Sequence, residues 1–196
     1  LVEAFEKLEL DVNDVVPNIL WSAEITLDFD AKDLWTLLID IGTNQTTFAV
    51  YEEWYPVYFG IVPIWWEDVT KDISIWMQLD IKQAEKLKKE KGYIYMQDEV
   101  IKEDESIDMR FLSDIIWARY EEIFDHINKA LIEIGKDCRL PGWVVLIWWG
   151  AKMGNLDKLA KLQFKLATAY WKDNVVGLWE LSTNIQYINV IWIDLW

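Results

Sequence analysis

The chain has 196 residues, of which 53% are hydrophobic, and a formal net charge of −15. This composition indicates one folded domain or two joined subdomains, and the negative charge argues against nucleic acid or an anionic membrane surface as the main partner. A single cysteine and a single histidine, Cys138 and His126, exclude an internal disulfide and argue against a transition-metal site. The sequence shows neither a signal peptide nor an apolar run of ~20 residues, so we expect a cytoplasmic protein.

The first third of the chain contains helical patterns followed by strand patterns. Apolar residues at helical spacing predict a helix over residues 1–10, and a second helix is predicted over 21–30. Alternating and β-branched residues then predict three strands, the last two joined as a hairpin. These strands cover residues 36–41, 46–52 and 55–62.

The middle of the chain is predicted to be mostly helical. One helix begins at Glu67, where acidic residues favour a helix N-terminus, and a second covers residues 80–93 and closes at a glycine. An acidic, irregular stretch at 93–109 precedes a long amphipathic helix that starts at Phe111 and stops at Gly135.

A strand over residues 143–147, a turn and a helix over 155–167 complete the predicted elements. Strand hairpins followed by a strand, a turn and a helix indicate an α/β fold, in which a mixed sheet is flanked by helices. In this arrangement residues 1–66 and 141–196 form the core subdomain, and residues 67–140 form an inserted subdomain.

Tryptophan is unusually frequent: the chain has 14, against 8 glycines, whereas glycine normally makes up about 7% of residues. Several tryptophans lie where the backbone needs the freedom of glycine. They are Trp35 before a strand, Trp54 in the hairpin, Trp65 and Trp66 between a strand and a helix, and Trp148 and Trp149 in the last turn. Three interpretations stay open: an aromatic binding surface, a deliberate redesign, or UGA codons that the source organism reads as glycine. We favour the third hypothesis.

The segment LLIDIGTNQTTFAVYEE carries the clearest candidate chemistry. Asp40 lies near the end of an apolar strand, and Gly42, Thr43 and Asn44 form the turn to the next strand. The backbone N–H groups and hydroxyls of such a turn can bind phosphate oxygens, while the carboxylate orients the water shell of Mg²⁺. A plain β-turn is the alternative interpretation of the same residues.

Three motifs, taken in order, resemble those of the actin-like ATPase superfamily, whose fold is ribonuclease H-like. With glycine in place of tryptophan, the segment above and the following IVPIWWEDVT resemble its second phosphate-binding motif. GWVVLIWWGAKMGNLDKLA resembles its adenosine motif, and AEKLKKEKGY resembles the segment between the two. The order of the motifs and the run LSDIIWARYEEIFDHINKAL are most similar to the bacterial cell-division family FtsA, and correspond to the C-terminal half of that family's chain.

The resemblance implies an ATP site with Mg²⁺. Asp40 would orient the metal through water, and Thr47 stands where the family has an acid, so at most weak ATP hydrolysis is expected. The implied contacts are Gly42, Thr43, Asn44 and Thr46 to phosphates, Glu85 and Lys88 to the nucleoside, and Trp148, Trp149, Gly150 and Lys152 in the adenosine turn. Two indoles in place of glycines would fill that turn, so the sequence as written predicts lost or weak ATP binding.

The resemblance also implies partners. We expect self-association into filaments, and binding of the C-terminal tail of the ring protein FtsZ by residues 67–140, with the lysines of KQAEKLKKEK as a candidate surface. A solvated helix face is the alternative for those lysines. Membrane attachment is expected only through a segment absent here, at the inner face of the cell membrane in the full-length protein. The pilus-assembly homologue PilM and a small-molecule kinase of the same superfamily are the alternative functions.

Overall fold

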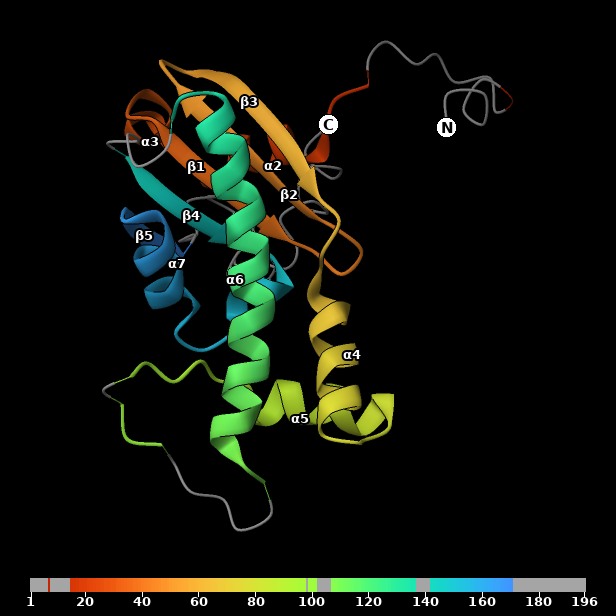
Figure 1. Cartoon of the computed structure of the whole chain (residues 1–196). Coiled ribbons are helices and arrows are strands. Elements are labelled where there is room, and N and C mark those ends of the chain that lie inside the picture. The colour runs from red at the N-terminus through yellow and green to blue at the C-terminus, as the bar shows by residue number, and fades with distance from the viewer. Residues whose placement is uncertain (1–6, 8–14, 98, 102–106, 137–141, 171–196) are drawn as a thin grey trace, which may run out of the picture.

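The computed structural model describes residues 7, 15–97, 99–101, 107–136 and 142–170. At its centre lies a five-stranded mixed sheet with the strand order β3-β2-β1-β4-β5 (Figure 1). The strands are β1 (Thr36–Ile41), β2 (Thr46–Glu52), β3 (Tyr55–Val62), β4 (Trp143–Ile147) and β5 (Ala167–Tyr170). β2 pairs antiparallel with β1 and β3, whereas β4 runs parallel to β1 and β5. The first four strands confirm the sequence prediction, and β5 is a strand that the sequence analysis does not predict.

Helices cover both faces of the sheet, which explains why its central strand is apolar along most of its length. All six residues of β1 are buried. Ile39 and its alternate neighbours face one hydrophobic cluster, whereas Leu38 faces a second cluster on the other side. A strand buried on both faces has no polar face to alternate with. Asp40 departs from this rule, because it is a carboxylate that is only 4% exposed.

The smaller cluster lies under two short helices, α2 (Asn18–Thr26) and α3 (Phe29–Asp33). They replace the single helix predicted over 21–30. The helix breaks because Leu27 adopts an extended conformation, and Asp28 then caps the start of α3 with its side chain. The helix predicted over 1–10 lies outside the described residues, apart from position 7.

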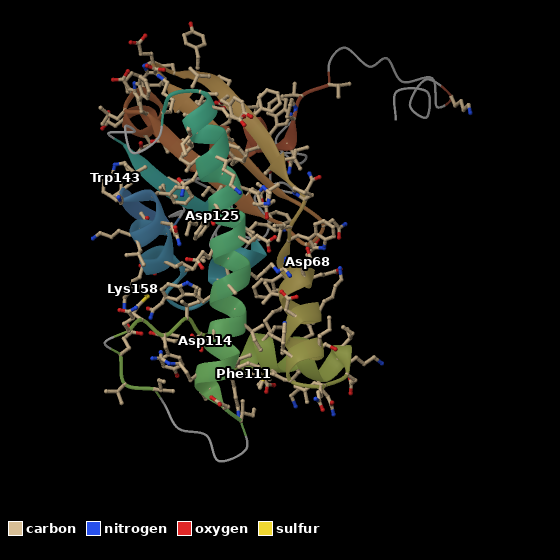
Figure 2. The ribbon with its side chains drawn as sticks, viewed as in Figure 1. Asp68, Phe111, Asp114, Asp125, Trp143 and Lys158 are labelled. Atoms are coloured by element: carbon tan, nitrogen blue, oxygen red, sulfur yellow. The ribbon has the colours of Figure 1, made fainter. Side chains whose placement is uncertain are left out.

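The opposite face of the sheet carries the larger hydrophobic cluster, which extends beyond the end of the sheet and includes residues of four helices (Figure 1). These are α4 (Trp66–Trp76), α5 (Ile81–Lys91), α6 (Met109–Glu133) and α7 (Leu156–Phe164). The first half of α6 packs against α4 beyond the end of the sheet, and its second half runs over the sheet (Figure 1). Its solvent side carries acids such as Asp114 and Asp125 (Figure 2). The long amphipathic helix predicted from the sequence is confirmed, and Gly135 follows it with a φ of 70°.

The segment between β3 and β4, where the insertion is predicted, contains α4, α5 and α6. Arg119 ties α6 to α4 through two hydrogen bonds to Asp72 of α4, at 2.6 and 2.9 Å. In its described residues, the acidic stretch at 93–109 forms an isolated bridge between Tyr93 and Gly154. The division of the chain into a core and an inserted subdomain stays a prediction.

Across the described ranges, no helix combines the length and the apolar character needed to cross a membrane. His126 is exposed on α6, as expected for a surface residue.

Candidate functional site

The predicted phosphate turn connects β1 to β2. Gly42 closes it, because its N–H donates to the carbonyl of Gln45 at 3.1 Å. Before and after the turn, Asp40 of β1 lies directly opposite Thr47 of β2, and both side chains are buried. The two residues predicted to serve catalysis are therefore cross-strand neighbours, close enough to interact directly.

Two hydrogen bonds fix this turn to the start of α4. The N–H of Trp66 donates to the carbonyl of Gly42 at 3.1 Å. The hydroxyl of Thr46 is buried and donates to the carbonyl of Ile64 at 2.6 Å. The Thr46 hydroxyl, which is predicted to contact phosphate, thus holds the turn against the segment that leads into α4. Thr43 is the residue of the turn whose side chain borders an open pocket.

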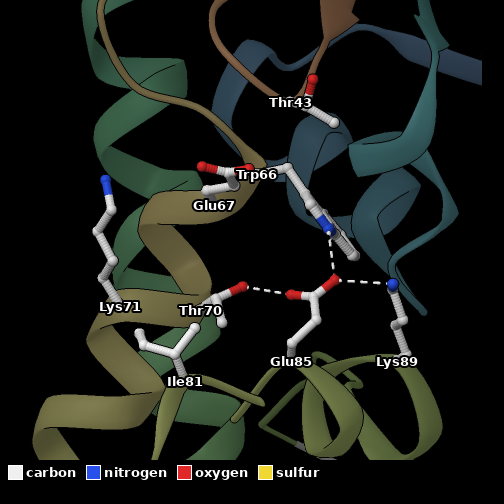
Figure 3. A pocket seen from close by; sticks show the side chains of 8 residues that line it. All are labelled: Thr43, Trp66, Glu67, Thr70, Lys71, Ile81, Glu85 and Lys89. Atoms are coloured by element: carbon white, nitrogen blue, oxygen red, sulfur yellow. Dashed lines mark hydrogen bonds and ion pairs between the residues drawn. The ribbon is translucent and has the colours of Figure 1, made fainter.

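This pocket lies between the turn and the helices α4 and α5, and has a volume of about 630 Å³ (Figure 3). Its lining residues are Thr43, Trp66, Glu67, Thr70, Lys71, Ile81, Glu85 and Lys89. In Figure 3 Thr43 lies at one end and Glu85 at the other, with the indole of Trp66 between them. A small organic ligand fits a pocket of this size.

Glu85 is the most strongly bonded acid of the pocket. Its carboxylate accepts hydrogen bonds from the Thr70 hydroxyl at 2.5 Å and from the indole N–H of Trp66 at 3.4 Å, and pairs with Lys89 at 3.0 Å and Lys88 at 2.7 Å. Partial burial alone would raise the pKa of Glu85, but the hydrogen bonds from Lys88, Thr70 and Lys89 outweigh it and lower the pKa to about 2. Glu85 therefore stays ionised at neutral pH.

Lys88 lies behind the pocket instead of lining it. It is 1% exposed, and its ammonium donates to the carbonyl of Trp66 at 2.9 Å and to the Thr70 hydroxyl. The ring of Trp66 covers it, with the Lys88 nitrogen 3.7 Å from the ring centroid. Burial lowers the pKa of Lys88 to about 8, although the neighbouring Glu85 opposes this shift. A direct contact between Lys88 and a nucleoside, as predicted from the sequence, is blocked by the indole.

The predicted adenosine turn follows β4 and lies beside the phosphate turn. Because β1 and β4 are parallel, their carboxyl ends meet at one edge of the sheet. A carbon added at Gly42 would lie 3.7 Å from Cδ1 of the Trp148 indole, so this ring lies against the phosphate turn. Gly150 is buried, and its carbonyl accepts a hydrogen bond from the hydroxyl of Tyr120 at 2.8 Å. Lys152 is exposed and does not line the pocket. The Trp149 side chain lies outside the described atoms.

Comparison with known proteins places the chain in a family. Residues 37–184 match the family described as "Cell division protein FtsA". The chain belongs to the FtsA family. It is 33% identical to FtsA of Enterococcus hirae over 95% of this chain and 43% of that protein. It is 30% identical to FtsA of Bacillus subtilis over 82% of this chain and 39% of that protein. The chain therefore spans about two fifths of the length of these FtsA relatives.

Solved structures show that the FtsA-family chain has the actin-like fold. The crystal structure of MreB5 of Spiroplasma citri bound to ADP has a TM-score of 0.72 and 17% identity, covering 98% of this chain and 63% of that one. The PilM–PilN type IV pilus biogenesis complex has a TM-score of 0.67 and 18% identity, covering 99% and 55%. These likenesses confirm the predicted fold class, and the family match favours FtsA over PilM.

Most of the residues that line the pocket of this FtsA-family chain could not be identified from their sequence motifs. Ile81 and Lys89 lie four residues before and after Glu85 on α5, and Trp66 lies four residues before Thr70 on α4. Residues four apart share one face of a helix, so this spacing was the available signal. What the sequence could not indicate is that these two helix faces oppose each other across the phosphate turn.

Proposed function

We propose that the chain binds ATP with Mg²⁺ in this pocket, as part of an actin-like cell-division protein. The observation that carries the proposal is a single pocket that joins Thr43 of the phosphate turn to the ionised Glu85 of α5. The residues suit the ligand: the Thr43 hydroxyl suits phosphate, and the Glu85 carboxylate suits ribose hydroxyls. The solved relative MreB5 carries ADP, which supports the same class of ligand.

Asp40 would orient the hydrated Mg²⁺, and Thr47 would lie at the position that affects ATP hydrolysis. A carboxylate at the end of β1 can orient the water shell of Mg²⁺, as expected for a cation that keeps several of its waters. Thr47 provides a hydroxyl but no base opposite this carboxylate. The bound metal would neutralise phosphate charge, and we propose weak ATP hydrolysis at most.

The nucleotide-binding test is a titration of the chain with MgATP by calorimetry. Glu85→Ala removes the carboxylate that lines the pocket and is expected to weaken binding by about tenfold or more, on the scale of a lost hydrogen bond to a charged group. Lys82→Ala is the matched control, because Lys82 is exposed on the same helix and does not line the pocket. Equal affinity in the two variants would refute the site.

We further propose that the chain self-associates end to end and binds the FtsZ tail, and that the full-length protein joins the division ring to the inner face of the cell membrane. A hollow of about 450 Å³ on α5 is lined by Ile81, by three lysines and by two acids, namely Lys82, Lys86, Lys89, Glu85 and Glu90, so lysines outnumber acids there. A tail peptide with acidic and apolar residues would meet both charge and apolar surface there. The chain's membership of the FtsA family supports this choice of partner.

The partner test combines two measurements. Binding of an FtsZ tail peptide is expected to weaken at least severalfold in Lys82→Glu/Lys86→Glu, while MgATP binding stays unchanged. Sedimentation with ATP tests filament formation. Phosphorylation of a sugar or of pantothenate by the chain would instead favour the kinase alternative and overturn the cell-division proposal.

A further inference from the structure

Three tryptophans have backbone angles that belong to glycine. Among the described residues, seven that are not glycine have a positive φ, and three of these are Trp35 at 60°, Trp54 at 76° and Trp148 at 76°. Among the described glycines, Gly135 is the one with a positive φ. A side chain on an L-residue meets the backbone at such angles, so a bulky residue there is a clear outlier.

Trp54 occupies the second position of a two-residue hairpin. Glu52 pairs with Tyr55, so Glu53 and Trp54 alone make the turn between β2 and β3, and both have positive φ. Two-residue turns with positive φ at both positions strongly prefer glycine at the second. The N–H of Trp54 donates to the carbonyl of Lys32 at 3.1 Å, which ties this turn to α3.

Trp35 follows the end of α3. The helix ends with Leu34 as its C-cap, and Trp35 is the next residue, with a φ of 60°. This is the position at which helices most often carry a glycine in the left-handed conformation. Its indole lies 3.1 Å from the Lys136 ammonium, measured to the ring centroid, so the ring has a partner although its backbone is unfavourable.

Trp148 is the first residue after β4. It combines a φ of 76° with a ψ of −171°, a region that is essentially restricted to glycine. Its carbonyl accepts the N–H of Ala151 at 3.2 Å, so the strained residue opens the turn that carries Gly150. This turn is the one that lies against the phosphate turn.

We infer that positions 35, 54 and 148 are glycines in the native protein, and that their codons are UGA, read as glycine by the source organism. The three sites lie in a hairpin, at a helix end and in the candidate site, so no common binding function explains them. A common codon does. It also explains why 14 tryptophans accompany 8 glycines. Trp66 does not have a positive φ; there the same assignment rests on the resemblance of IVPIWWEDVT to a phosphate-binding motif that has glycine at this position.

The consequence for the pocket rests on the proposed function. Glycine at position 148 removes the ring that lies against Gly42, and glycine at position 66 removes the ring that covers Lys88. Lys88 would then border the pocket next to Glu85. The native site therefore has more room between the two turns, and Lys88 adds one more charged group to the pocket lining.

The codons and the native protein test the assignment directly. The gene is expected to carry UGA at positions 35, 54 and 148, and peptide mass spectrometry of the protein from its source organism is expected to show glycine there. A UGG codon, or a tryptophan residue in the native peptide, at any of these positions overturns the inference.

Paired substitutions in the chain test the backbone argument without the gene. Substitution by glycine or by alanine removes the indole in both cases, so the difference in stability between the two variants reports the cost of a side chain at a positive φ. Trp54→Gly is therefore expected to have a higher denaturation midpoint than Trp54→Ala, and Trp35→Gly a higher one than Trp35→Ala. The control is Trp143, which lies within β4 and lacks a positive φ. At this position the alanine variant is expected to have a higher denaturation midpoint than the glycine variant, because glycine destabilises a strand interior. A midpoint for Ala at or above that for Gly at both test positions overturns the inference.

The pocket is tested separately with the double variant Trp66→Gly/Trp148→Gly. Its affinity for MgATP is expected to rise at least tenfold over the unchanged chain, while Trp35→Gly and Trp54→Gly leave it unchanged. If the midpoints at 35 and 54 follow the glycine pattern but the double variant gains no affinity, the nucleotide site is refuted and the glycine assignment stands.

Discussion

The buried Lys88 should make the stability of the fold rise with pH above neutrality. Burial lowers its pKa from 10.5 to about 8, so the folded chain holds the ammonium proton less tightly than the unfolded chain. A lowered pKa of a base therefore reduces stability below pH 8, and the loss is recovered as pH rises through 8 toward 10.5. One pKa unit corresponds to about 1.4 kcal/mol. The full effect is about 3 kcal/mol, of which about 2 kcal/mol falls between about pH 7 and about pH 9.5.

The assay is urea denaturation followed by far-UV circular dichroism across this range. Burial raises the pKa of Tyr51 from 10.0 to about 12, so its opposite effect begins above the range. Lys88→Met is expected to abolish the rise, whereas Lys89→Met, which also removes a partner of Glu85 but an exposed one, is expected to retain it. A flat profile in the unchanged chain, or an undiminished rise in Lys88→Met, would refute the argument.

Three further predictions concern the groups around the site. Glu85, with a pKa lowered to about 2, contributes stability that is present above pH 4.5 and is lost as pH falls toward 2. Because this group is partly exposed, screening by solvent reduces the effect to about 1 kcal/mol. Glu85→Gln is expected to remove this acid dependence of stability in urea titrations. Thr46→Val leaves the carbonyl of Ile64 without its 2.6 Å partner and is expected to cost about 1 to 3 kcal/mol of unfolding free energy; no change in the urea midpoint would contradict this. Tyr120→Phe removes the 2.8 Å bond to Gly150, with an expected loss of about 1 to 2 kcal/mol in the same assay, and a loss below the error of the midpoint would count against it.

The strands could be predicted because local pattern and tertiary environment agree there. Thr36–Ile41 and Trp143–Ile147 are short apolar runs, typical of strands covered on both faces, and their bounds follow from sequence. β5 could not be found in this way. It has four residues and forms through parallel pairing with β4. The helix before it ends at Phe164, and its C-cap Lys165 adopts a left-handed conformation without a glycine to mark the end of the helix. The sequence therefore predicts a helix that continues to residue 167.

The candidate site could be predicted where it depends on the edge of the sheet. Two turns that follow parallel strands must lie side by side, and the phosphate turn and the adenosine turn do so. The pocket residues on α4 and α5 depend on how these helices pack beyond that edge. The spacing of residues along either helix does not determine this packing. The sequence therefore identifies Glu85 but misses Lys89, which takes the place in the pocket lining that was predicted for Lys88.

The conflict between the predicted role of Lys88 and its burial has one structural cause. The ammonium is withheld from the pocket by the ring of Trp66, which also takes a hydrogen-bonding position on Glu85. If position 66 carries glycine, the burial that lowers the pKa of Lys88 is relieved and its ammonium faces the place of the nucleoside. The predicted rise of stability with pH and the weak MgATP binding expected for the chain would then be two effects of one indole, and both should disappear together in Trp66→Gly. Loss of the pH effect without any gain in MgATP affinity would separate them, and would leave Lys88 a structural role alone.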